Sequence, residues 1–554
     1  MREVELVNRN SEPTINLALD TIDKRKQALV FVNTKRSAEK VAEDIAGKLQ
    51  GVPEMEEFAE RAENVLGSPT KQCLRLGKCL RKGIAFHHAG LHQKQKEMIE
   101  KGFRDGDIRI IACTPTLAAG LDLPAFRAII RDLKRHGGVW GMTPIPVLEY
   151  HQMAGRAGRP GKDDYSEAIT IAKSIDDVED IKETYIDGKP ESIYSKLAVE
   201  PVLRTYILSL IASGFVNTEK SVIEFFSRTF WAKQYKDMNK LSSIILKMID
   251  LLEGYGFIFT KRREEISVGK VEKEEKEEDP FVSADNIEDE AFKKENEAFN
   301  KEDRKKENKI RATPLGKRVA ELYLDPYTAN HLITCLRDSS EMGEVPLESY
   351  IHMISHTIEM RPLVRMRKKT EEYVSDFLMM YEDKLFEQEP SMYDEGFQEF
   401  YDSVNTTLFF RDWMEETDEE VLLEKYGVRP GETRYKLDSA EWLLYASVEF
   451  CKIMGLREIQ RTLNKLIIRI KYGVKEELLP LLKFRNVGRV RARKLFDNGI
   501  KDIGDVKKAS LTTLSQIVGS KIAQSLKEQM GDETEEISDR KLKGQMAIGK
   551  YSKK

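Results

Sequence analysis

The sequence predicts a multidomain fold of class α/β plus α, in which one parallel α/β domain precedes several mainly helical domains. Its 554 residues suffice for roughly three or four domains of about 100–200 residues each. Short apolar strand patterns alternate with helical patterns over residues 1–190, as in doubly wound α/β domains. After Pro190, apolar residues recur at three-to-four spacing, which indicates helices.

The α/β domain begins with a buried-strand pattern at residues 27–33 (QALVFVN), which helical spacing at 35–49 follows. Further strands are expected at 84–86, 108–112 and 128–131. Ligands of such folds lie beyond the carboxyl ends of the strands. Residues that follow these strands are therefore candidates for a functional site.

A winged-helix pattern comes next. Residues 256–260 (GFIFT) and 309–313 (KIRAT) can pair as a hairpin after three helices. Between them, residues 261–311 hold 14 Lys or Arg and 17 Asp or Glu, too many charges to bury a core. We therefore expect a winged-helix domain over 191–325, with a solvated insertion in its wing that is either largely disordered or a frayed helix. The three helices are expected at 194–214, 221–235 and 240–255.

The remaining chain divides into a helical bundle at 326–477, a compact helical unit at 478–532 and a basic tail at 533–554. Charge is concentrated in part of this region. Residues 452–508 hold 16 basic and 6 acidic residues, a local net charge of +10, although the whole chain carries −4. Such a segment favours a polyanionic partner.

The composition argues against several classes of protein. No apolar run is long enough to cross a membrane, and the N-terminus lacks the apolar core of a signal peptide. The five cysteines are scattered without a CxxC pair, which argues against a zinc site or a disulfide framework. We expect a cytoplasmic protein with no metal site of its own and no membrane partner.

The strongest motif is QMAGRAGRP at residues 152–160. Its arginines, Arg156 and Arg159, share one face of a helix start, and its glycines let backbone approach a phosphate. Guanidinium groups match phosphate oxygens bidentately, so this pair can serve as arginine fingers on a γ-phosphate. A loop that only contacts nucleic acid is the alternative.

Three further segments lie where a predicted strand ends: VFVNTKRSAE (30–39), AFHHAGL (85–91) and TPTLAAGLDLP (114–124). In this order, the four motifs closely resemble the second RecA-like motor domain of superfamily-two helicases. Within the Ski-like branch, the chain is most similar to the archaeal Hjm-type (Holliday-junction-migration) DNA helicases. The resemblance extends through nearly the whole chain. It implies a RecA-like domain at 1–190, followed by a winged helix, a ratchet bundle and a helix-hairpin-helix domain.

The resemblance also implies roles for individual residues. The family more often has Asn at the position of Asp122, and a carboxylate, unlike Asn, cannot donate a hydrogen bond. For His88, packing within the sheet is the alternative to a nucleic-acid contact. The implied residues of the ATP cleft are Gln152, Arg156 and Arg159, the catalytic set, with Gly120 and Asp122. The implied contacts to the nucleic-acid backbone are Thr34, His88, Thr114 and Thr116.

Between these motifs, residues 128–147 are similar to the β-hairpin with which the family splits the duplex. Gly137-Gly138 would form its turn. His136 and Trp140 would lie near the tip, where an aromatic side chain can stack on the last base pair. The alternative is an ordinary crossover with a packed Trp.

Two helical segments are expected to contact DNA. The resemblance places Arg434, Tyr435 and Trp442 on the long ratchet helix, where the Trp stacks on single-stranded DNA. The family favours Arg at the position of Tyr435, and a core Trp is the alternative for Trp442. Val487-Gly488-Arg489-Val490 resembles the hairpin of a helix-hairpin-helix motif, so Gly488, Arg489 and Arg491 are expected at a phosphate.

Two motifs of a complete motor are missing from the 554 residues: no GxxxxGK[ST] occurs, and no DExH follows a strand. We therefore expect a first RecA-like domain on a separate chain, with ATP and Mg²⁺ as cofactors and the Mg²⁺ ligands on that domain.

The expected function is the C-terminal part of an ATP-dependent 3′–5′ DNA helicase, an ATP hydrolase that unwinds branched or forked DNA in repair and replication restart. The alternatives are a non-catalytic DNA-binding or regulatory subunit, and an RNA-directed Ski-like helicase. In the tail, QMAIGKY (545–551) resembles a motif that docks on the sliding clamp. A DNA-contacting tail, or one that binds a single-strand-binding protein, is the alternative.

Overall fold

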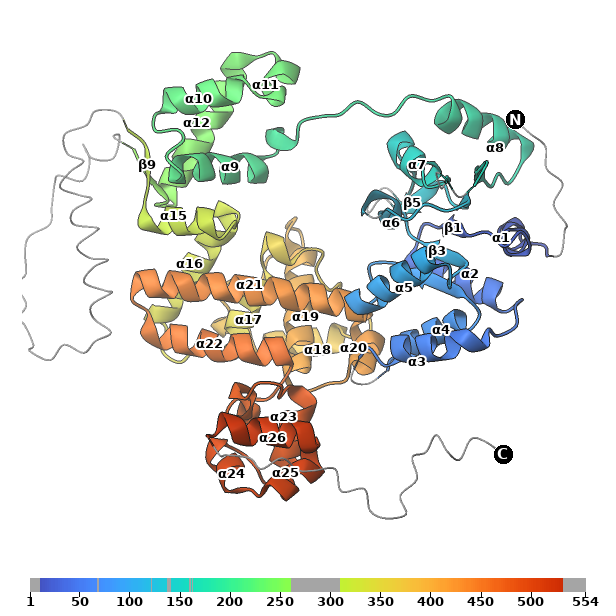
Figure 1. Ribbon diagram of the computed structural model, residues 1–554. Coiled ribbons are helices and arrows are strands. Elements are labelled where there is room, and N and C mark those ends of the chain that lie inside the picture. Colours follow the sequence, from blue (N-terminus) through green and yellow to red (C-terminus); the bar gives the residue numbers. More distant parts are fainter. Residues whose placement is uncertain are drawn as a thin grey trace, which may run out of the picture.

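The computed structural model describes residues 10–66, 69–120, 122–136, 141–158, 161, 163–260 and 309–531 (Figure 1). Predictions that concern Trp140, Arg159, the charged insertion at 261–308 and the tail from 532 onward lie outside these residues.

The α/β domain is built on a five-stranded parallel sheet in the order β2-β3-β1-β4-β7. Four predicted strands are confirmed, and every residue in them is buried. The fifth strand was not predicted, because its half-exposed EAIT sequence lacks a buried-strand pattern. The strands are β1 (Ala28–Phe31), β2 (Ile84–His87), β3 (Ile110–Cys113), β4 (Arg127–Ile130) and β7 (Glu167–Thr170).

One buried arginine fastens the first helix to this sheet. Arg127 is 1% exposed, and its guanidinium donates to the Leu17 carbonyl (2.8 Å), the Thr21 hydroxyl (2.7 Å) and the Glu167 carboxylate (2.7 Å). A buried charge is tolerated only when it is paired in this way. The helices of the domain are α1 (Pro13–Asp23), α2 (Lys35–Ala46), α3 (Glu56–Glu63), α4 (Lys71–Leu80), α5 (Gln93–Asp105), α6 (Thr116–Gly120), α7 (Val147–Ala154) and α8 (Ile175–Ile181).

A separate antiparallel hairpin leaves the sheet after β4. Its arms are β5 (Lys134–His136) and β6 (Met142–Pro144), with His136 opposite Met142. The two extended arms predicted on either side of Gly137-Gly138 are thereby confirmed.

The winged-helix region follows a long connection from α8 (Figure 1). The predicted hairpin is confirmed, since Ile258 pairs with Ala312 and Phe259 with Arg311. The helix predicted at 221–235 is two helices, because the Thr229 hydroxyl accepts a hydrogen bond from the Ala232 amide and caps a new helix there. The elements are α9 (Glu200–Ala212), α10 (Glu219–Ser227), α11 (Phe230–Tyr235), α12 (Met238–Gly254), β8 (Ile258–Phe259), β9 (Arg311–Ala312) and α15 (Pro314–Glu321).

The helical bundle shares one apolar core with the winged-helix region, so these two parts pack as a unit. Its longest helix, α21, lies alongside α22 (Figure 1). The bundle comprises α16 (Pro326–Glu341), α17 (Leu347–Ser355), α18 (Glu371–Tyr381), α19 (Phe397–Met414), α20 (Glu419–Tyr426), α21 (Pro430–Met454) and α22 (Arg457–Tyr472).

The last described unit has an apolar core of its own, with Leu481, Val487, Leu495, Val506 and Leu514 at its centre. Its helices are α23 (Arg489–Asp497), α24 (Ile503–Lys508), α25 (Leu511–Val518) and α26 (Ser520–Gln529). Across the described residues, no helix is both long and apolar enough to span a bilayer.

Candidate nucleotide and nucleic-acid interfaces

In the arginine motif, QMAGRAGRP at residues 152–160, Arg156 is the second residue after the end of α7. Its guanidinium donates through Nε (3.1 Å) and Nη2 to the Ala118 carbonyl of α6, and Nη1 lies 3.4 Å from Oδ1 of Asp122. The Asp122 side chain is 95% exposed. The structure therefore brings Arg156 together with Asp122 and the end of α6, where Gly120 lies, as the sequence predicts for the nucleotide contacts.

The backbone of Arg156 lies near the amino-terminal end of β4, while its guanidinium reaches α6. Ala157 pairs with Ala125, two residues before β4, and the Ala125 amide donates to the Arg156 carbonyl (2.9 Å). Gln152 is exposed on α7, and a side chain added at Gly120 would meet open space. A guanidinium, an amide and an unobstructed glycine fit the oxygens of a polyphosphate.

The threonines follow the carboxyl-terminal ends of their strands. Thr34 follows β1 and Thr114 follows β3, and these strands are parallel neighbours in register, so the two residues share the carboxyl-terminal edge of the sheet. The Thr34 hydroxyl accepts a hydrogen bond from the Ser37 amide (3.0 Å) and caps α2. The Thr114 and Thr116 hydroxyls are 3.0 Å apart, and Thr34 and Thr116 are exposed. Hydroxyls exposed at one edge can reach a nucleic-acid backbone.

His88 follows β2 at the same edge but is fully buried. Its Nε2 lies 3.2 Å from Oε1 of Glu39, its Nδ1 accepts a hydrogen bond from the Gly90 amide (3.1 Å), and its ring stacks on Phe86. Burial lowers the pKa of His88. This geometry is that of a packed histidine, the alternative that the sequence left open.

A buried carboxylate beside His88 joins distant parts of the chain. Glu39 of α2 is 3% exposed and accepts hydrogen bonds from Gln72 (3.0 Å), Arg75 (2.6 Å) and Arg429 (3.3 Å). Burial opposes its ionisation, but His88 and the two arginines lower the pKa of Glu39 to about 2. Arg429 is the N-cap residue of α21, so Glu39 connects the α/β domain to the longest helix of the bundle.

Backbone atoms also take part in the contact between the α/β domain and α21. The Gly431 amide donates to the Gly90 carbonyl (3.1 Å), and Lys35 of α2 forms an ion pair with Glu432. A Cβ at Gly90 would collide with the Arg429 side chain, and one at Gly431 with the Ala89 and Leu91 carbonyls. The loop after β2 and the first turn of α21 thus pack backbone to backbone. We call this contact the α2–α21 joint.

Sequence reasoning missed Glu39 and Arg429. Glu39 is one of many acids on an amphipathic helix, and its partner Arg429 lies 390 residues further along the chain. The only available signal was Gly90 within the HHAGL segment, because a glycine permits such a close approach.

Along α21, the predicted DNA contacts have different surroundings. Tyr435 is 53% exposed, and Arg434 at the surface pairs with Asp438 (2.7 Å). Trp442 is half-buried against the shared core, and its Nε1 donates to the Leu322 carbonyl (3.1 Å). Arg434 and Tyr435 are therefore open to a ligand, whereas Trp442 also connects the bundle to the winged-helix region.

In the helix-hairpin-helix segment, the residues predicted to contact DNA also have different surroundings. Gly488 precedes α23, a Cβ there would meet open space, and Arg491 is exposed with a hydrogen bond to the Asn486 carbonyl (2.8 Å). Arg489 instead turns toward the bundle. Its guanidinium lies 5.2 Å from the Trp413 ring centre and donates to the Thr417 carbonyl (3.0 Å). Gly488 and Arg491 thus remain accessible, while Arg489 docks the unit on the bundle.

In the hairpin, His136 ends β5, and neither its side chain nor Trp140 is among the described parts. Arg135, one residue earlier, pairs with Glu149 of α7 (2.6 Å). The hairpin is thereby connected to the helix that leads into the arginine motif.

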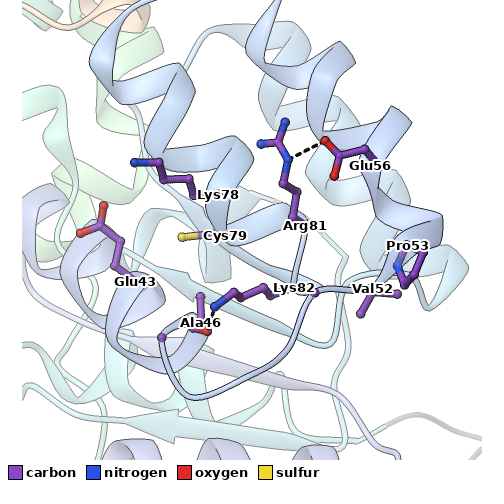
Figure 2. A pocket seen from close by; sticks show the side chains of 11 residues that line it. Glu43, Ala46, Val52, Pro53, Glu56, Lys78, Cys79, Arg81 and Lys82 are labelled. Atoms are coloured by element: carbon purple, nitrogen blue, oxygen red, sulfur yellow. Dashed lines mark hydrogen bonds and ion pairs between the residues drawn. The ribbon is translucent and has the colours of Figure 1, made fainter.

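A pocket of about 680 Å³ lies away from all of these residues, between the ends of α2 and α4 (Figure 2). Two of its cations already have partners: Lys82 donates to the Ala46 carbonyl (2.8 Å), and Arg81 pairs with Glu56 (2.8 Å). None of the predicted site residues lines this pocket, and we assign no ligand to it.

Three family models match the chain. "Helicase conserved C-terminal domain" covers residues 13–161, "Archaeal helicase, domain 4" covers 348–473, and "SAM-like Helix-hairpin-helix tandem" covers 478–532. These matches confirm the fold class predicted from the sequence, a RecA-like α/β domain with a helical bundle and a helix-hairpin-helix domain.

Curated relatives match over nearly the whole chain, and each is described as "ATP-dependent DNA helicase Hel308". The protein of Methanococcus vannielii is 36% identical over 542 residues, which cover 94% of this chain and 68% of the relative. That of Methanocella arvoryzae is 34% identical over 545 residues (96% and 66%), and that of Pyrococcus horikoshii 33% over 531 residues (93% and 66%). The chain spans about two thirds of the length of these relatives, and the archaeal helicase resemblance is confirmed.

Proposed function

Because the chain belongs to the Hel308 family of archaeal ATP-dependent DNA helicases, we propose that it provides the second motor domain and the DNA-guiding domains of such an enzyme. The proposed division is a motor domain at 1–190, a winged helix at 191–325, a ratchet bundle at 326–477 and a helix-hairpin-helix domain at 478–532. The tail at 533–554 follows.

The observation that carries this proposal is the position of Arg156. Its guanidinium is held by the Ala118 carbonyl of α6 beside the exposed Asp122, and its backbone lies near the amino-terminal end of β4. When bound, ATP supplies the free energy of γ-phosphate hydrolysis. Arg156 and Arg159 stabilise the negative charge that develops on the phosphate, and Gln152 orients the groups around it.

Nucleic acid is proposed to follow the carboxyl-terminal edge of the sheet. Thr34, Thr114 and Thr116 contact its backbone, and the β5–β6 hairpin, with His136 and Trp140, separates the strands. Tyr435 and Trp442 then stack on the single strand, and Gly488 and Arg491 hold a phosphate. The substrate is branched or forked DNA, and movement runs in the 3′–5′ direction.

Hydrolysis needs a phosphate-binding loop and Mg²⁺ ligands, and the 554 residues contain neither a GxxxxGK[ST] nor a DExH motif. We propose that a first RecA-like domain on a separate chain supplies them. Through its tail, the chain would further contact a sliding clamp or a single-strand-binding protein.

Reconstitution tests the proposal. We expect the chain alone to hydrolyse no ATP, and to gain DNA-stimulated hydrolysis when mixed with a first RecA-like domain of a relative. Arg156→Ala or Arg159→Ala should then lower turnover by about 10³-fold or more, the typical contribution of an arginine finger. Arg156→Lys should not restore turnover, because an ammonium lacks the guanidinium fork.

The control is Arg104→Ala, an exposed arginine on α5 remote from the motif, which should leave turnover unchanged. DNA binding should survive in every variant. Wild-type turnover by Arg156→Ala and Arg159→Ala would remove both residues from the reaction. A reconstituted pair that binds DNA without hydrolysing ATP would favour a DNA-binding subunit.

A further inference from the structure

The helical bundle carries a surface that the proposed mechanism does not use. It comprises residues 371–402, which hold 11 Asp or Glu and one Lys. These residues form α18, the short 3₁₀ turn η7 (Glu382–Lys384), the following loop and the start of α19. We call this region the acidic surface.

Most carboxylates of the acidic surface are not neutralised. Glu387 and Glu399 pair with His331 and Arg361, respectively. Like charges held this close repel one another and repel nucleic acid, so the surface disfavours DNA and favours a cationic partner. Six carboxylates are exposed and form no ion pair with any described residue: Glu371, Glu372, Asp376, Glu382, Asp383 and Glu395.

The same surface exposes large apolar side chains. Met379 is 87% exposed, Met380 66%, Met392 67% and Tyr393 91%. The core beneath does not need them, because Phe377 on the opposite side of α18 is buried. Methionine adapts to many apolar partners, and exposed apolar groups surrounded by polar ones mark sites of protein interaction.

We propose that the acidic surface binds the C-terminal tail of the same chain, residues 540–554. The tail sequence contains six Lys or Arg and no Asp or Glu, and it carries the apolar residues Met546, Ile548 and Tyr551. Both features of the surface, its negative charge and its exposed methionines and tyrosine, therefore have a counterpart in the tail.

The helix-hairpin-helix domain is anchored close to this surface. Arg489 and Arg493 of α23 contact Thr417 and Glu416, just after α19, and α18 packs on α19. Eight residues lie between Gly531 and the start of this segment at Arg540, enough to span about 30 Å, whereas α18 is about 16 Å long. A tether of this length raises the effective concentration to the millimolar range, so a weak contact suffices.

Zero-length carbodiimide cross-linking of the full chain tests this proposal, because it joins lysines only to carboxylates in direct contact. We expect lysines of 541–554 to cross-link to carboxylates of the acidic surface. Neutralising four of them (Glu371→Gln, Glu372→Gln, Glu382→Gln, Asp383→Asn) should lower the yield at the remaining ones about tenfold, equivalent to 1.4 kcal/mol. Met379→Ser/Tyr393→Ser should also lower it, at unchanged charge.

The matched control neutralises four exposed carboxylates in the α8 region (Asp176→Asn, Glu179→Gln, Asp180→Asn, Glu183→Gln) and should leave the yield unchanged. All substituted side chains are exposed, so the variants should fold. Mixing isotopically light and heavy chains separates contacts within one chain from contacts between chains. Cross-links between chains, a spread over α8 and the acidic surface alike, or no cross-link to 371–402 would each overturn the proposal.

Discussion

Tyr435 and Trp442 lie on the same helix, but the fold depends on them to different extents. Tyr435 is 53% exposed, whereas Trp442 packs on the core and donates a hydrogen bond to the Leu322 carbonyl. A substitution at Tyr435 can therefore test contact with DNA without disturbing packing. At Trp442, ring and N–H group must be tested separately.

We expect Tyr435→Ala to weaken binding of single-stranded DNA by about 1–3 kcal/mol, the value of one stacked base, at unchanged thermal stability. Trp442→Phe keeps a ring but loses the N–H donor, so stability should fall by about 0.5–1.5 kcal/mol while binding is largely kept. Fluorescence anisotropy and thermal denaturation measure the two effects. Neither change should alter the salt dependence of binding, because stacking releases no counterions.

Tyr445→Ala is the matched control, since Tyr445 is a 45% exposed tyrosine on the same helix with no predicted DNA contact. If Tyr435→Ala binds as tightly as wild type, the ratchet contact does not pass through Tyr435. A Trp442→Ala chain that is destabilised yet binds normally would make Trp442 a packing residue only.

The pKa values of two histidines in the bundle are shifted in opposite directions. His352 of α17 is fully buried with Nε2 2.9 Å from the Ser403 hydroxyl, and burial lowers its pKa well below 6.5. For His331 of α16 burial has the same effect, but contacts with Cys335 and Glu387 outweigh it and raise its pKa to about 10. The folded bundle therefore prefers a neutral His352 and a protonated His331.

These shifts predict a stability maximum near neutral pH. Below pH 6.5 the unfolded chain protonates His352 while the folded chain does not, so stability falls by up to about 1.4 kcal/mol per pH unit. Between pH 6.5 and about 10, only the folded chain keeps the His331 proton, so stability is lost as pH rises. Calorimetry at pH 5, 7 and 9 measures how stability changes with pH. Below neutral pH, stability should fall less steeply for His352→Gln than for wild type, and above neutral pH it should fall less steeply for His331→Gln. If both variants lose stability with pH as steeply as wild type, these two histidines are not the cause of the pH dependence.

At this scale, the sequence predicted residues whose chemistry is local. Arg156 lies beside Asp122 because both belong to short motifs that the fold brings together at the end of α6. It did not separate Arg489 from Arg491, because helical position alone does not tell which of two nearby arginines faces the bundle. Glu39 was missed because a partner on a remote helix leaves no pattern in the sequence.

At the scale of elements, the α2–α21 joint makes one body of the α/β domain and the start of the longest helix. It combines the buried Glu39–Arg429 contact, the Gly90–Gly431 backbone contact and the Lys35–Glu432 ion pair. We therefore expect a displacement of α2 to be transmitted to α21.

We expect Glu39→Gln and Arg429→Met each to loosen this joint. Each change removes one contact from the network around the buried Glu39. Residues in one hydrogen-bond network couple by about 0.5–3 kcal/mol, so the double variant should lose less than the sum of the singles. Denaturation gives the coupling energy, and hydrogen exchange should rise in both α2 and the first turns of α21. Glu57→Gln, an exposed residue on α3, is the control. Additive losses, with exchange raised in α2 alone, would show that the contact transmits nothing.

Elements with strong local patterns were predictable, and those defined by their neighbours were not. Strands β1 to β4 were expected because their buried residues are apolar except for His87 at the end of β2 and Arg127 at the start of β4. Strand β7 was missed because this edge strand is half-exposed and so has no buried-strand pattern. Its extended backbone is held by pairing with β4. The break between α10 and α11 was missed because a single capping threonine, Thr229, interrupts an otherwise continuous apolar spacing.

At the scale of the whole molecule, positive and negative charge occupy different regions. Residues 452–508 carry a net charge of +10, and the acidic surface holds 11 Asp or Glu and one Lys, while the whole chain carries only −4. A near-neutral chain can therefore present one region that attracts DNA and another that repels it. Part of the basic charge is already used, since Lys471 pairs with Glu441 and Arg493 with Glu416.

This separation predicts which cations set the salt dependence of DNA binding. The affinity of the chain for single-stranded DNA should fall steeply with salt, because each phosphate neutralised on a single strand contributes about −0.7 to the slope of log K against log salt. Arg461→Ala and Arg491→Ala remove exposed cations, so each should flatten the slope by about 0.7. Lys471→Ala should not, because Glu441 already neutralises that charge (2.7 Å). Titrations from low to moderate salt measure the slope, and equal slopes for all four proteins would mean that DNA binds elsewhere on the molecule.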